Sequence, residues 1–249
     1  MRGWVRALLR RQPPSVGRVR FGNLRRLAPV SRCFGFDRGL PIDRYYIEAF
    51  LRRHGNAAGY GAGDIRGRVL EVGGDEYARR FGGWSPEDAE AAHSAVSALD
   101  VLHVDTSNAT ATIIGDLVTG ANLPSESFDC VICTQTLHVV YDVDAAVHTL
   151  HRILKPGGVA LVTVAGISQV CRPDRDLWGD YWRFTTLSAR RLFEGAFPAA
   201  GLRVEAAGNV LAAVSFLQGL AAGELRPHEL DSRDPDYEML ITIRAVKGP

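Results

Sequence analysis

Apolar and polar residues follow two different spacings in the middle of the chain. Residues 128–134 are almost continuously apolar, which is typical of a strand buried on both faces of a sheet. Residues 146–154 repeat apolar side chains at helical spacing, and the proline and two glycines at 156–158 favour a helix end. Residues 159–164 are apolar again. The pattern predicts a parallel strand, helix and strand, and the loop at 134–138 lies where an open parallel sheet places its ligands.

The rest of the chain supplies the other elements of such a sheet. Residues 68–74 form an apolar strand that ends in two glycines, as the first strand of a nucleotide-binding sheet does. Only ten residues separate Asp105 from Asp116, so we expect the helix between the second and third strands to be reduced to a turn. The other predicted elements are strands at 101–105, 111–114, 202–206 and 237–246, helices at 41–51, 188–193 and 210–225, and a helix start at Ser85-Pro86.

These elements predict an α/β fold with a doubly wound, mostly parallel, seven-stranded Rossmann-like sheet and an N-terminal helical extension. We divide the chain into a basic N-terminal extension and lid, residues 1–63, and a sheet domain, residues 64–249. The glycine-rich residues 55–63 are the linker or turn between the two parts.

Charge is distributed unevenly between the two parts. The net charge is +1, yet thirteen arginines up to Arg53 face only three acidic residues, which gives +10 there and −9 in the remainder. The near-zero total argues against a general nucleic-acid binder. The four cysteines are predicted to be small buried residues in a reducing cytoplasm, and Cys130 and Cys133 should point to opposite faces of one strand, which prevents a disulfide or a shared metal. We expect no metal site.

The first eleven residues allow two interpretations. They lack the apolar core of a signal peptide, and no apolar run in the chain approaches the roughly 20 residues of a membrane span, so we expect no stable membrane insertion. One interpretation is a peripheral amphipathic helix, because four apolar residues could share a face between arginines. The other is a solvated tail that ends at Pro13-Pro14. The four residues are Trp4, Val5, Leu8 and Leu9.

Two sequence motifs resemble one enzyme family. Phe128-Asp129 opens the predicted fourth strand, and Leu154-Lys155-Pro156-Gly157-Gly158 precedes the fifth. This combination is similar to the fourth and fifth strands of class I S-adenosylmethionine-dependent methyltransferases. The resemblance covers roughly residues 65–246 and implies S-adenosyl-L-methionine as the cofactor. The stretch from Asp180 to Thr185 also resembles bacterial methyltransferases found with glycosyltransferases and natural-product pathways.

The resemblance implies a cofactor site at the strand ends. Glu71 would meet the cofactor's ammonium, while Gly73 and Gly74 let the backbone approach its methionyl part without a Cβ clash. The family usually continues with further glycines; this chain has Asp75, which could add an ammonium acceptor, and Tyr77. An ordinary glycine turn is the alternative interpretation.

Two further acids extend the implied cofactor site. Asp105 stands where the ribose-binding acid belongs, with Asp100 as the substitute if the strand register differs. Asp116 and Leu117 resemble the adenine motif, in which the carboxylate accepts from the amine and the apolar side chain covers the ring. Thr134 completes the predicted cofactor contacts. Either aspartate could instead cap a loop.

The acceptor side is predicted from the loops beyond the fourth and fifth strands. His138 is the candidate catalytic base, because its pKa lies near neutrality; a packed histidine is the alternative. Residues 32–46 could act as a lid whose arginines suit an anionic acceptor. The predicted substrate-binding residues are Tyr45, Tyr46, Trp178, Tyr181, Trp182 and Arg183, and for Arg183 a structural pair with a carboxylate is the alternative.

The sequence therefore predicts methyl transfer from S-adenosylmethionine to the oxygen of a small hydroxylated or glycosylated metabolite. One alternative is a protein that binds the cofactor without transferring methyl groups. A nicotinamide-dependent oxidoreductase is the other alternative, although residues 73–78 do not supply its complete glycine motif. The expected partner is a small-molecule acceptor and not a nucleic acid, and the oligomeric state stays open.

Overall fold

The computed structural model describes residues 13–55, 63–85 and 95–249. Its centre is a seven-stranded sheet in the order β3-β2-β1-β4-β5-β7-β6, in which β7 runs antiparallel to both of its neighbours and the other pairs are parallel. The predicted doubly wound, mostly parallel sheet is confirmed. The strands are β1 (Gly67–Val72), β2 (Val96–His103), β3 (Ile113–Ile114), β4 (Phe128–Thr134), β5 (Leu154–Ala165), β6 (Leu202–Ala207) and β7 (Leu240–Val246).

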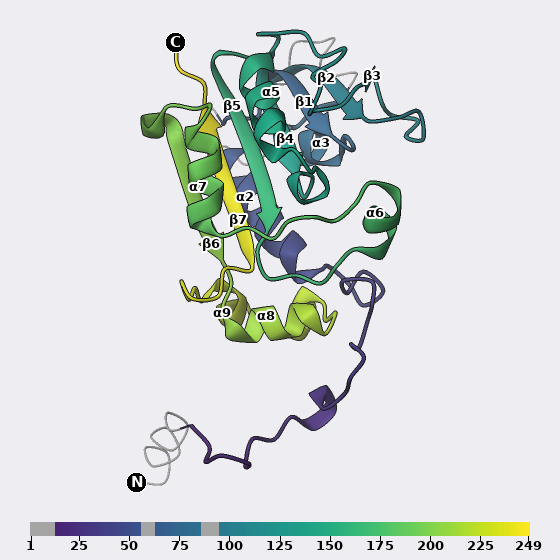
Figure 1. Cartoon of the computed structure of the whole chain (residues 1–249), viewed down its shortest axis with the longest axis vertical. Coiled ribbons are helices and arrows are strands. Elements are labelled where there is room, and N and C mark those ends of the chain that lie inside the picture. Colours follow the sequence, from purple (N-terminus) through teal and green to yellow (C-terminus); the bar gives the residue numbers. More distant parts are fainter. Residues whose placement is uncertain (1–12, 56–62, 86–94) are drawn as a thin grey trace.

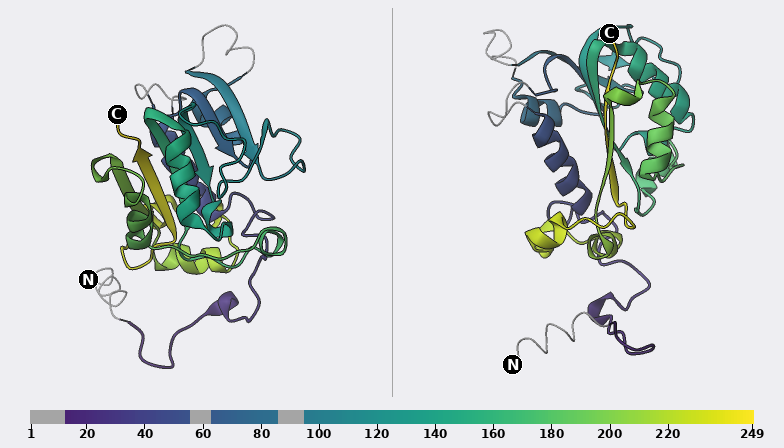
Figure 2. Two further views of the ribbon diagram at one scale, coloured as in Figure 1. Left: turned by 45° about the horizontal axis from the view of Figure 1, so that its top comes forward. Right: turned by 90° about the vertical axis from the view of Figure 1, so that its left-hand side faces the viewer.

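Helices cover both faces of this sheet (Figure 1). Helices α5 and α7 lie on one face and α2 on the other, as the edge-on view shows (Figure 2). The helices are α2 (Ile42–His54), α3 (Glu76–Gly82), α5 (Val143–Ile153), α6 (Arg172–Leu177), α7 (Thr186–Glu194), α8 (Val210–Leu217) and α9 (Pro227–Asp231). Short 3-10 turns are η1 (Gly22–Leu24), η2 (Leu137–Val139), η3 (Ala199–Gly201) and η4 (Ala222–Glu224).

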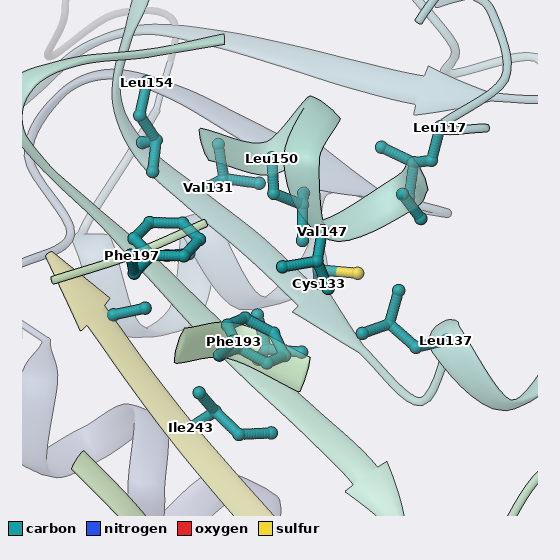
Figure 3. Packing of buried hydrophobic residues seen from close by; sticks show 14 of the residues in the cluster. Leu117, Val131, Cys133, Leu137, Val147, Leu150, Leu154, Phe193, Phe197 and Ile243 are labelled. Atoms are coloured by element: carbon teal, nitrogen blue, oxygen red, sulfur yellow. The ribbon is translucent and has the colours of Figure 1, made fainter. Parts of the chain in front are cut away.

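Two apolar cores lie on opposite sides of the sheet. One packs Val131 and Cys133 of β4 against α5 and α7, through Leu150 and Phe193 (Figure 3). The other packs Cys130 and its neighbours against α2, α3 and α8. The two cysteines thus point to opposite faces, as predicted, because successive strand residues alternate. All four cysteines are free thiols, but the prediction that all are buried is wrong for Cys33, which is exposed, and for Cys171, which is only partly buried.

Several predicted boundaries differ from the structure. Strand β2 begins at Val96 and ends at His103, before Asp105, and β3 has only two residues. The described residues between these strands contain no helix, which confirms the expected turn. The predicted helix start at Ser85-Pro86 falls mostly on residues outside the described part of the chain.

The helix predicted at 210–225 is wrong in length, because α8 ends at Leu217. Gly219 follows in a left-handed conformation with φ of 71°, and a Cβ there would lie 2.2 Å from the carbonyl oxygen of Ser31. The last strand is also shorter than predicted. It begins at Leu240 because Tyr237 is held in a turn, where its backbone N–H donates to Asp234 O at 3.1 Å.

The N-terminal extension joins the body beside α8 and η4. Ala222 N donates to Leu40 O at 2.7 Å, and Pro41 forms an isolated bridge with Ala221. Arg38 makes two hydrogen bonds to Glu224, at 2.9 Å from Nε and 2.5 Å from Nη2. These contacts fix residues 31–41 at the end of the sheet where the parallel strands finish. In the described part of the chain, no helix is both long and apolar enough to cross a membrane.

Candidate functional site

A cavity of about 730 Å³ lies at the carboxyl ends of the parallel strands. Its volume falls in the range of small-molecule sites, roughly 300–1,000 Å³. The sheet topology places the cavity there. Strands β1 and β4 are neighbours, and the chain leaves β1 toward β2 on one side and leaves β4 toward β5 on the other, which opens a crevice between the two connections. The predicted site residues that line it are Glu71, Gly73, Gly74, Asp116, Leu117, Thr134, His138, Trp178, Tyr181 and Arg183.

Gly73 and Gly74 leave open space at the end of β1. Gly73 has φ of 90°, a conformation that L side chains rarely adopt, and a Cβ built on either glycine meets no atom within 4 Å. Both glycines line the cavity. A side chain at Gly73 would therefore be strained and would fill space that a ligand can use.

Glu71 lies on β1 beneath these glycines, with 3% of its surface exposed. Its carboxylate accepts hydrogen bonds from the backbone N–H groups of Tyr77, at 3.1 Å, and Ala78, at 2.7 Å, in the first turn of α3. Burial raises the pKa of Glu71 to about 7, although these two hydrogen bonds oppose the shift. A cation in the cavity would favour the ionised carboxylate, because it would offset the lost solvation.

The wall after β3 is formed by Asp116 and Leu117. Asp116 Oδ1 accepts from the backbone N–H of Val118 at 2.8 Å, so this carboxylate also shapes its own loop, in line with the capping alternative. The other carboxylate oxygen, Oδ2, accepts no hydrogen bond from the described residues. Leu117 is 4% exposed and packs into the core. One acceptor oxygen and one apolar surface thus border the cavity side by side.

The end of β4 is strained. Gln135, directly after Thr134, has φ of 50°, in the left-handed region that costs a non-glycine residue on the order of 1–3 kcal/mol. Its backbone N–H donates to Thr163 O on β5 at 2.9 Å, and the residue lines the cavity. The turn directs residues 135–138 over the cavity, and no sequence pattern indicated Gln135.

His138 stands in η2, 7% exposed, and lines the cavity. Its Nδ1 atom is buried and has no hydrogen-bond partner in the described part of the chain. Burial lowers the pKa of His138, and the Asp180 carboxylate opposes this shift. The imidazole is therefore neutral at pH 7, and in its Nε2–H form it presents an unused acceptor atom at Nδ1.

The loop after β5 is held to the η2 loop by backbone bonds. His138 O accepts from the N–H groups of Tyr181, at 2.8 Å, and Trp182, at 3.2 Å. The indole Nε1 of Trp182 donates to the carbonyl oxygens of Val140 and Tyr141. Trp182 thus fastens the two loops together and does not line the cavity.

Arg183 is fully engaged by the protein. Nη1 and Nη2 bond the carboxylate of Asp180, at 2.5 and 3.0 Å, and Asp180 has a fully buried side chain. The carbonyl oxygens of Trp182, Gln169 and Ser168 take the remaining N–H groups, at 2.8, 2.6 and 3.4 Å. A guanidinium has five N–H donors, so none is left for a ligand. This geometry favours the structural alternative for Arg183.

Aromatic rings form the outer wall of the cavity. Tyr141 packs edge-on against Tyr181, with 5.3 Å between ring centroids, and Trp178 packs edge-on against His103 at 6.1 Å. Tyr141, Trp178 and Tyr181 are 70%, 40% and 49% exposed, although aromatic side chains of this size are usually more buried. They offer apolar surface at the mouth of the cavity.

Four other predicted site residues lie outside this cavity. Asp75 accepts from Arg79 Nε at 2.7 Å, one helical turn away, and Asp105 is exposed, where Ser107 N and the His103 ring hold its carboxylate. The Ser107 hydrogen bonds lower the pKa of Asp105. Tyr45 and Tyr46 direct their hydroxyl groups to Asp231 and Leu230 O near α9.

The phase of α2 explains the placement of the tyrosines. Residues advance about 100° per position around a helix, so the neighbours Asp43 and Arg44 face the cavity instead. Arg44 lies over the rings of Phe36 and Tyr77, at 5.9 Å from each centroid, and also bonds the Tyr77 hydroxyl group. Its buried Nε atom has no partner among the described residues.

Phe34 and Phe36 also line the cavity, and they come from the N-terminal extension. The sequence indicated only that residues 32–46 could cover the site and did not single out these two residues. The signal available in the sequence was that Phe34 and Phe36 flank Gly35 and that Phe36 precedes Asp37. Among the described residues, no group of histidine, cysteine and acidic side chains has the geometry of a metal site.

A comparison with protein families matches about a third of the chain. Residues 84–162 match a protein family described as a methyltransferase domain. The match begins after β1, so it includes β2, β3, β4, α5 and most of β5 but not Glu71, Gly73 or Gly74. No curated protein matches the chain in sequence.

Several solved structures that resemble this chain are described as methyltransferases. Phosphoethanolamine N-methyltransferase 2 of Haemonchus contortus, solved with S-adenosyl-L-methionine, is 16% identical with a TM-score of 0.49, over 92% of this chain and 55% of that chain. An S-adenosylmethionine-dependent methyltransferase from Mesorhizobium loti is 16% identical, with a TM-score of 0.48 over 86% and 100%. A putative methyltransferase, solved in complex with the Haloferax volcanii Trm112 methyltransferase activator, is 18% identical. Its TM-score is 0.48, over 83% of this chain and 91% of that chain.

This chain spans about half the length of the Haemonchus protein. The strand order defines the class of fold, a doubly wound and mostly parallel Rossmann-like sheet, and within it residues 84–162 match a methyltransferase domain.

Proposed function

We propose that this protein transfers a methyl group from S-adenosyl-L-methionine to the oxygen of a small hydroxylated or glycosylated metabolite, of the kind made in bacterial natural-product or glycan pathways. One observation carries the proposal: Glu71, the open glycines Gly73 and Gly74, Asp116 and His138 all border the same cavity, although they come from the ends of three separate strands.

The cavity suits the cofactor at both of its ends. The buried carboxylate of Glu71 and the free oxygen of Asp116 would hold the ammonium and the adenine amine, and Leu117 would cover the adenine ring. Gly73 and Gly74 give the methionyl part room, since a Cβ at either position would point into open space. When bound, the cofactor supplies an electrophilic methyl group on its sulfonium. Asp105 would bind the ribose only if its exposed loop turned inward, so we assign it a lesser contribution.

His138 would act on the acceptor. Its unpaired Nδ1 can accept the proton that an acceptor hydroxyl loses as the new oxygen–carbon bond forms. The hydrogen bonds from Tyr181 and Trp182 to His138 O fix the backbone at this residue, and burial of the side chain restricts the ring. A base in a fixed orientation needs no reorganisation during the reaction, which lowers the barrier.

The acceptor would lie against the aromatic wall and the N-terminal extension. Trp178 and Tyr181 supply flat apolar surface, while Phe34, Phe36 and Arg44 close the opposite side. Tyr45 and Tyr46 support this side indirectly, because their hydroxyl bonds near α9 hold α2 in position. Four free thiols suit a reducing cytoplasm, which we propose as the location.

Isothermal titration calorimetry tests the cofactor part of the proposal. We expect micromolar binding of S-adenosylmethionine and of S-adenosylhomocysteine in metal-free buffer, and no binding of NADH. Absence of binding, or binding of NADH instead, would contradict it.

A second measurement separates transfer from mere binding. Incubation with a mixed pool of hydroxylated and glycosylated acceptors should release S-adenosylhomocysteine. Tight cofactor binding without any release would favour the alternative of a cofactor-binding protein, which the missing glycines after Gly74 keep open.

A further inference from the structure

The N-terminal arm, which we define as residues 13–30, exposes apolar side chains to solvent. Val16 and Leu27 are fully exposed, and Val19 and Phe21 are 48% and 52% exposed. The arm also carries four arginines and no acidic residue. The apolar side chains of such a segment would gain free energy by packing against another apolar surface, while the arginines could stay in contact with water.

A second unpartnered surface lies on α8. Val210, Leu211, Val214 and Leu217 are 41–49% exposed, while Ala212, Ala213 and Phe216 face the core. We call these four exposed side chains the α8 face. Exposed apolar residues recur at one side of the helix, which is the pattern of a surface that packs against another element.

The surroundings of the α8 face are acidic. Residues 227–236, which follow η4 and include α9, carry four carboxylates and one arginine. That arginine, Arg233, lies 3.7 Å from Glu205 and is therefore already near a carboxylate. Helix α9 is tied to the start of α8, because Asn209 Nδ2 donates to Glu229 O and Ser232 O, at 2.7 Å each. The α8 face and the acidic residues thus form one surface whose charge is opposite to that of the arm.

Within one chain, the exposed apolar side chains of the arm and those of the α8 face both remain open to solvent. The arm leaves the body at the carboxyl end of α8, where Ser31 N donates to Gln218 O at 3.1 Å, and it runs below α8 and α9 in the two figures (Figures 1 and 2). The exposed fractions above show that its apolar residues do not cover the α8 face. The same chain therefore offers a basic, apolar arm and an acidic, apolar surface, and neither is covered by another described segment.

We propose that two copies of this chain form a dimer in which the arm of each copy lies across the α8 face of the other. The arm joins the body at Ser31, next to α8, so the arm and the α8 face lie close together in each copy. Two identical contacts related by a two-fold axis can therefore form at once and close the assembly. Each copy contributes its 18-residue arm to one contact and its α8 face to the other.

Sedimentation velocity and light scattering of the full chain test this proposal. We expect a mass twice that of the 27.1 kDa chain at micromolar concentration, with dissociation promoted by high salt because the contact joins opposite charges. A variant lacking residues 1–30 keeps Ser31 and the residues that line the cavity, and it should be monomeric. The variant Leu211→Glu/Val214→Glu changes only exposed side chains and should also be monomeric.

A matched control and a mixing experiment exclude indirect effects. Leu187→Glu alters a side chain on α7 that is 77% exposed, and this variant should remain dimeric. An equimolar mixture of the truncated chain and the α8-face variant should regain a heterodimer, since one supplies the face and the other supplies the arm. Circular dichroism should show that every variant is folded.

Three results would overturn the proposal. They are a monomeric full chain at these concentrations, a dimer that survives both the truncation and the α8-face variant, and a monomer that floats with anionic phosphatidylserine vesicles through the same arm. The last result would assign the arm to a membrane surface.

Discussion

Burial sets the protonation of His138 and Glu71, two titratable side chains at the cavity. Desolvation disfavours the charged form of each group, so it lowers the pKa of the histidine and raises that of the carboxyl. The imidazole is thereby kept neutral at pH 7, while the carboxyl group keeps its proton to a higher pH than an ordinary glutamate does. The same physical cause thus shifts the two pKa values in opposite directions.

His138→Ala should lower turnover by about 10²–10⁴-fold, because a general base contributes in the transition state. Cofactor affinity measured by calorimetry should hardly change. Turnover of the native protein should fall only below pH 6.5, since the pKa of His138 is lowered from this value and the neutral form persists to that point. The matched control His148→Ala, on a side chain that is 54% exposed on α5, should leave turnover intact. Equal rates for both variants would assign His138 to packing.

Glu71 predicts a pH dependence of stability. Its pKa is about 7 in the folded protein against an ordinary glutamate value of 4.5, so the folded state binds more protons than the unfolded state between these values. Stability therefore falls as pH rises through this window, by on the order of 1 kcal/mol per pH unit. Urea denaturation from pH 5 to pH 8 should show this slope in the native protein without cofactor and a shallower one in Glu71→Gln. The exposed glutamate changed in Glu194→Gln, on α7 and away from the cavity, should keep the native slope, and identical slopes in all three would refute the assignment.

Gly73 and Gly83 allow the effect of backbone strain to be separated from the effect of filling the cavity. Both have positive φ, 90° and 70°, and a Cβ built on either would meet no atom within 4 Å, yet only Gly73 lines the cavity. Changing either to alanine should cost on the order of 1 kcal/mol of stability. Only Gly73→Ala should also weaken cofactor binding, by tenfold or more in calorimetry. Equal affinity of the two variants would show that the cofactor does not approach Gly73.

At the scale of elements, the loop at 168–183 is held by a buried ion pair. The Arg183 guanidinium lowers the pKa of Asp180, a group that burial alone would raise, and Asp180 Oδ2 also accepts from Cys171 N at 2.9 Å. The pair therefore connects the start of α6 to the segment that precedes α7. Helix α6 and the η2 loop keep their positions around the cavity through this connection.

Arg183→Ala should destabilise the protein by about 3 kcal/mol in urea denaturation, because it leaves the Asp180 charge buried and unpaired. The control Arg175→Ala removes an exposed pair with Asp176 and should cost less than about 1 kcal/mol. Comparable losses would show that the Asp180 pair is not the structural anchor of this loop.

At the scale of the whole molecule, both the sheet domain and the N-terminal extension contribute residues to the cavity. The sheet domain supplies Glu71, Gly73, Gly74 and Asp116, whereas the extension supplies Phe34 and Phe36. Loss of the extension should thus affect the two ligands unequally. Closure of a segment over a bound ligand commonly excludes water from such sites.

Deleting residues 1–12 should leave cofactor binding and methyl transfer unchanged. Deleting residues 1–38 should abolish methyl transfer while much of the cofactor affinity measured by calorimetry remains. The variant lacking residues 1–30 keeps both phenylalanines, so it separates the acceptor site from the proposed dimer. Full transfer activity after the longest deletion would refute the role of the extension as a lid.

The sequence alone determined the order of the strands along the chain and four of the helices, but it did not predict α3, α6 or α9. Residues 128–134 and 159–164 are apolar with little interruption and residues 42–51 repeat at helical spacing, and these periods depend only on near neighbours. The turn between β2 and β3 followed from chain length, since ten residues cannot hold a helix and a strand. The two glycines after β1 were found at the end of an apolar run, whereas the acids at the strand ends were implied by the resemblance to a known family.

Tertiary structure alone decided which side chains meet. The apolar spacing along α2 can be read from the sequence, but the rotation of this helix about its own axis relative to the sheet cannot. The sequence therefore predicted Tyr45 and Tyr46 at the cavity, whereas the structure has Asp43 and Arg44 there. The five acceptors of Arg183 and the unpaired Nδ1 of His138 likewise depend on contacts between separate loops. Such contacts are fixed by packing across the whole sheet, and no local period of residues encodes them.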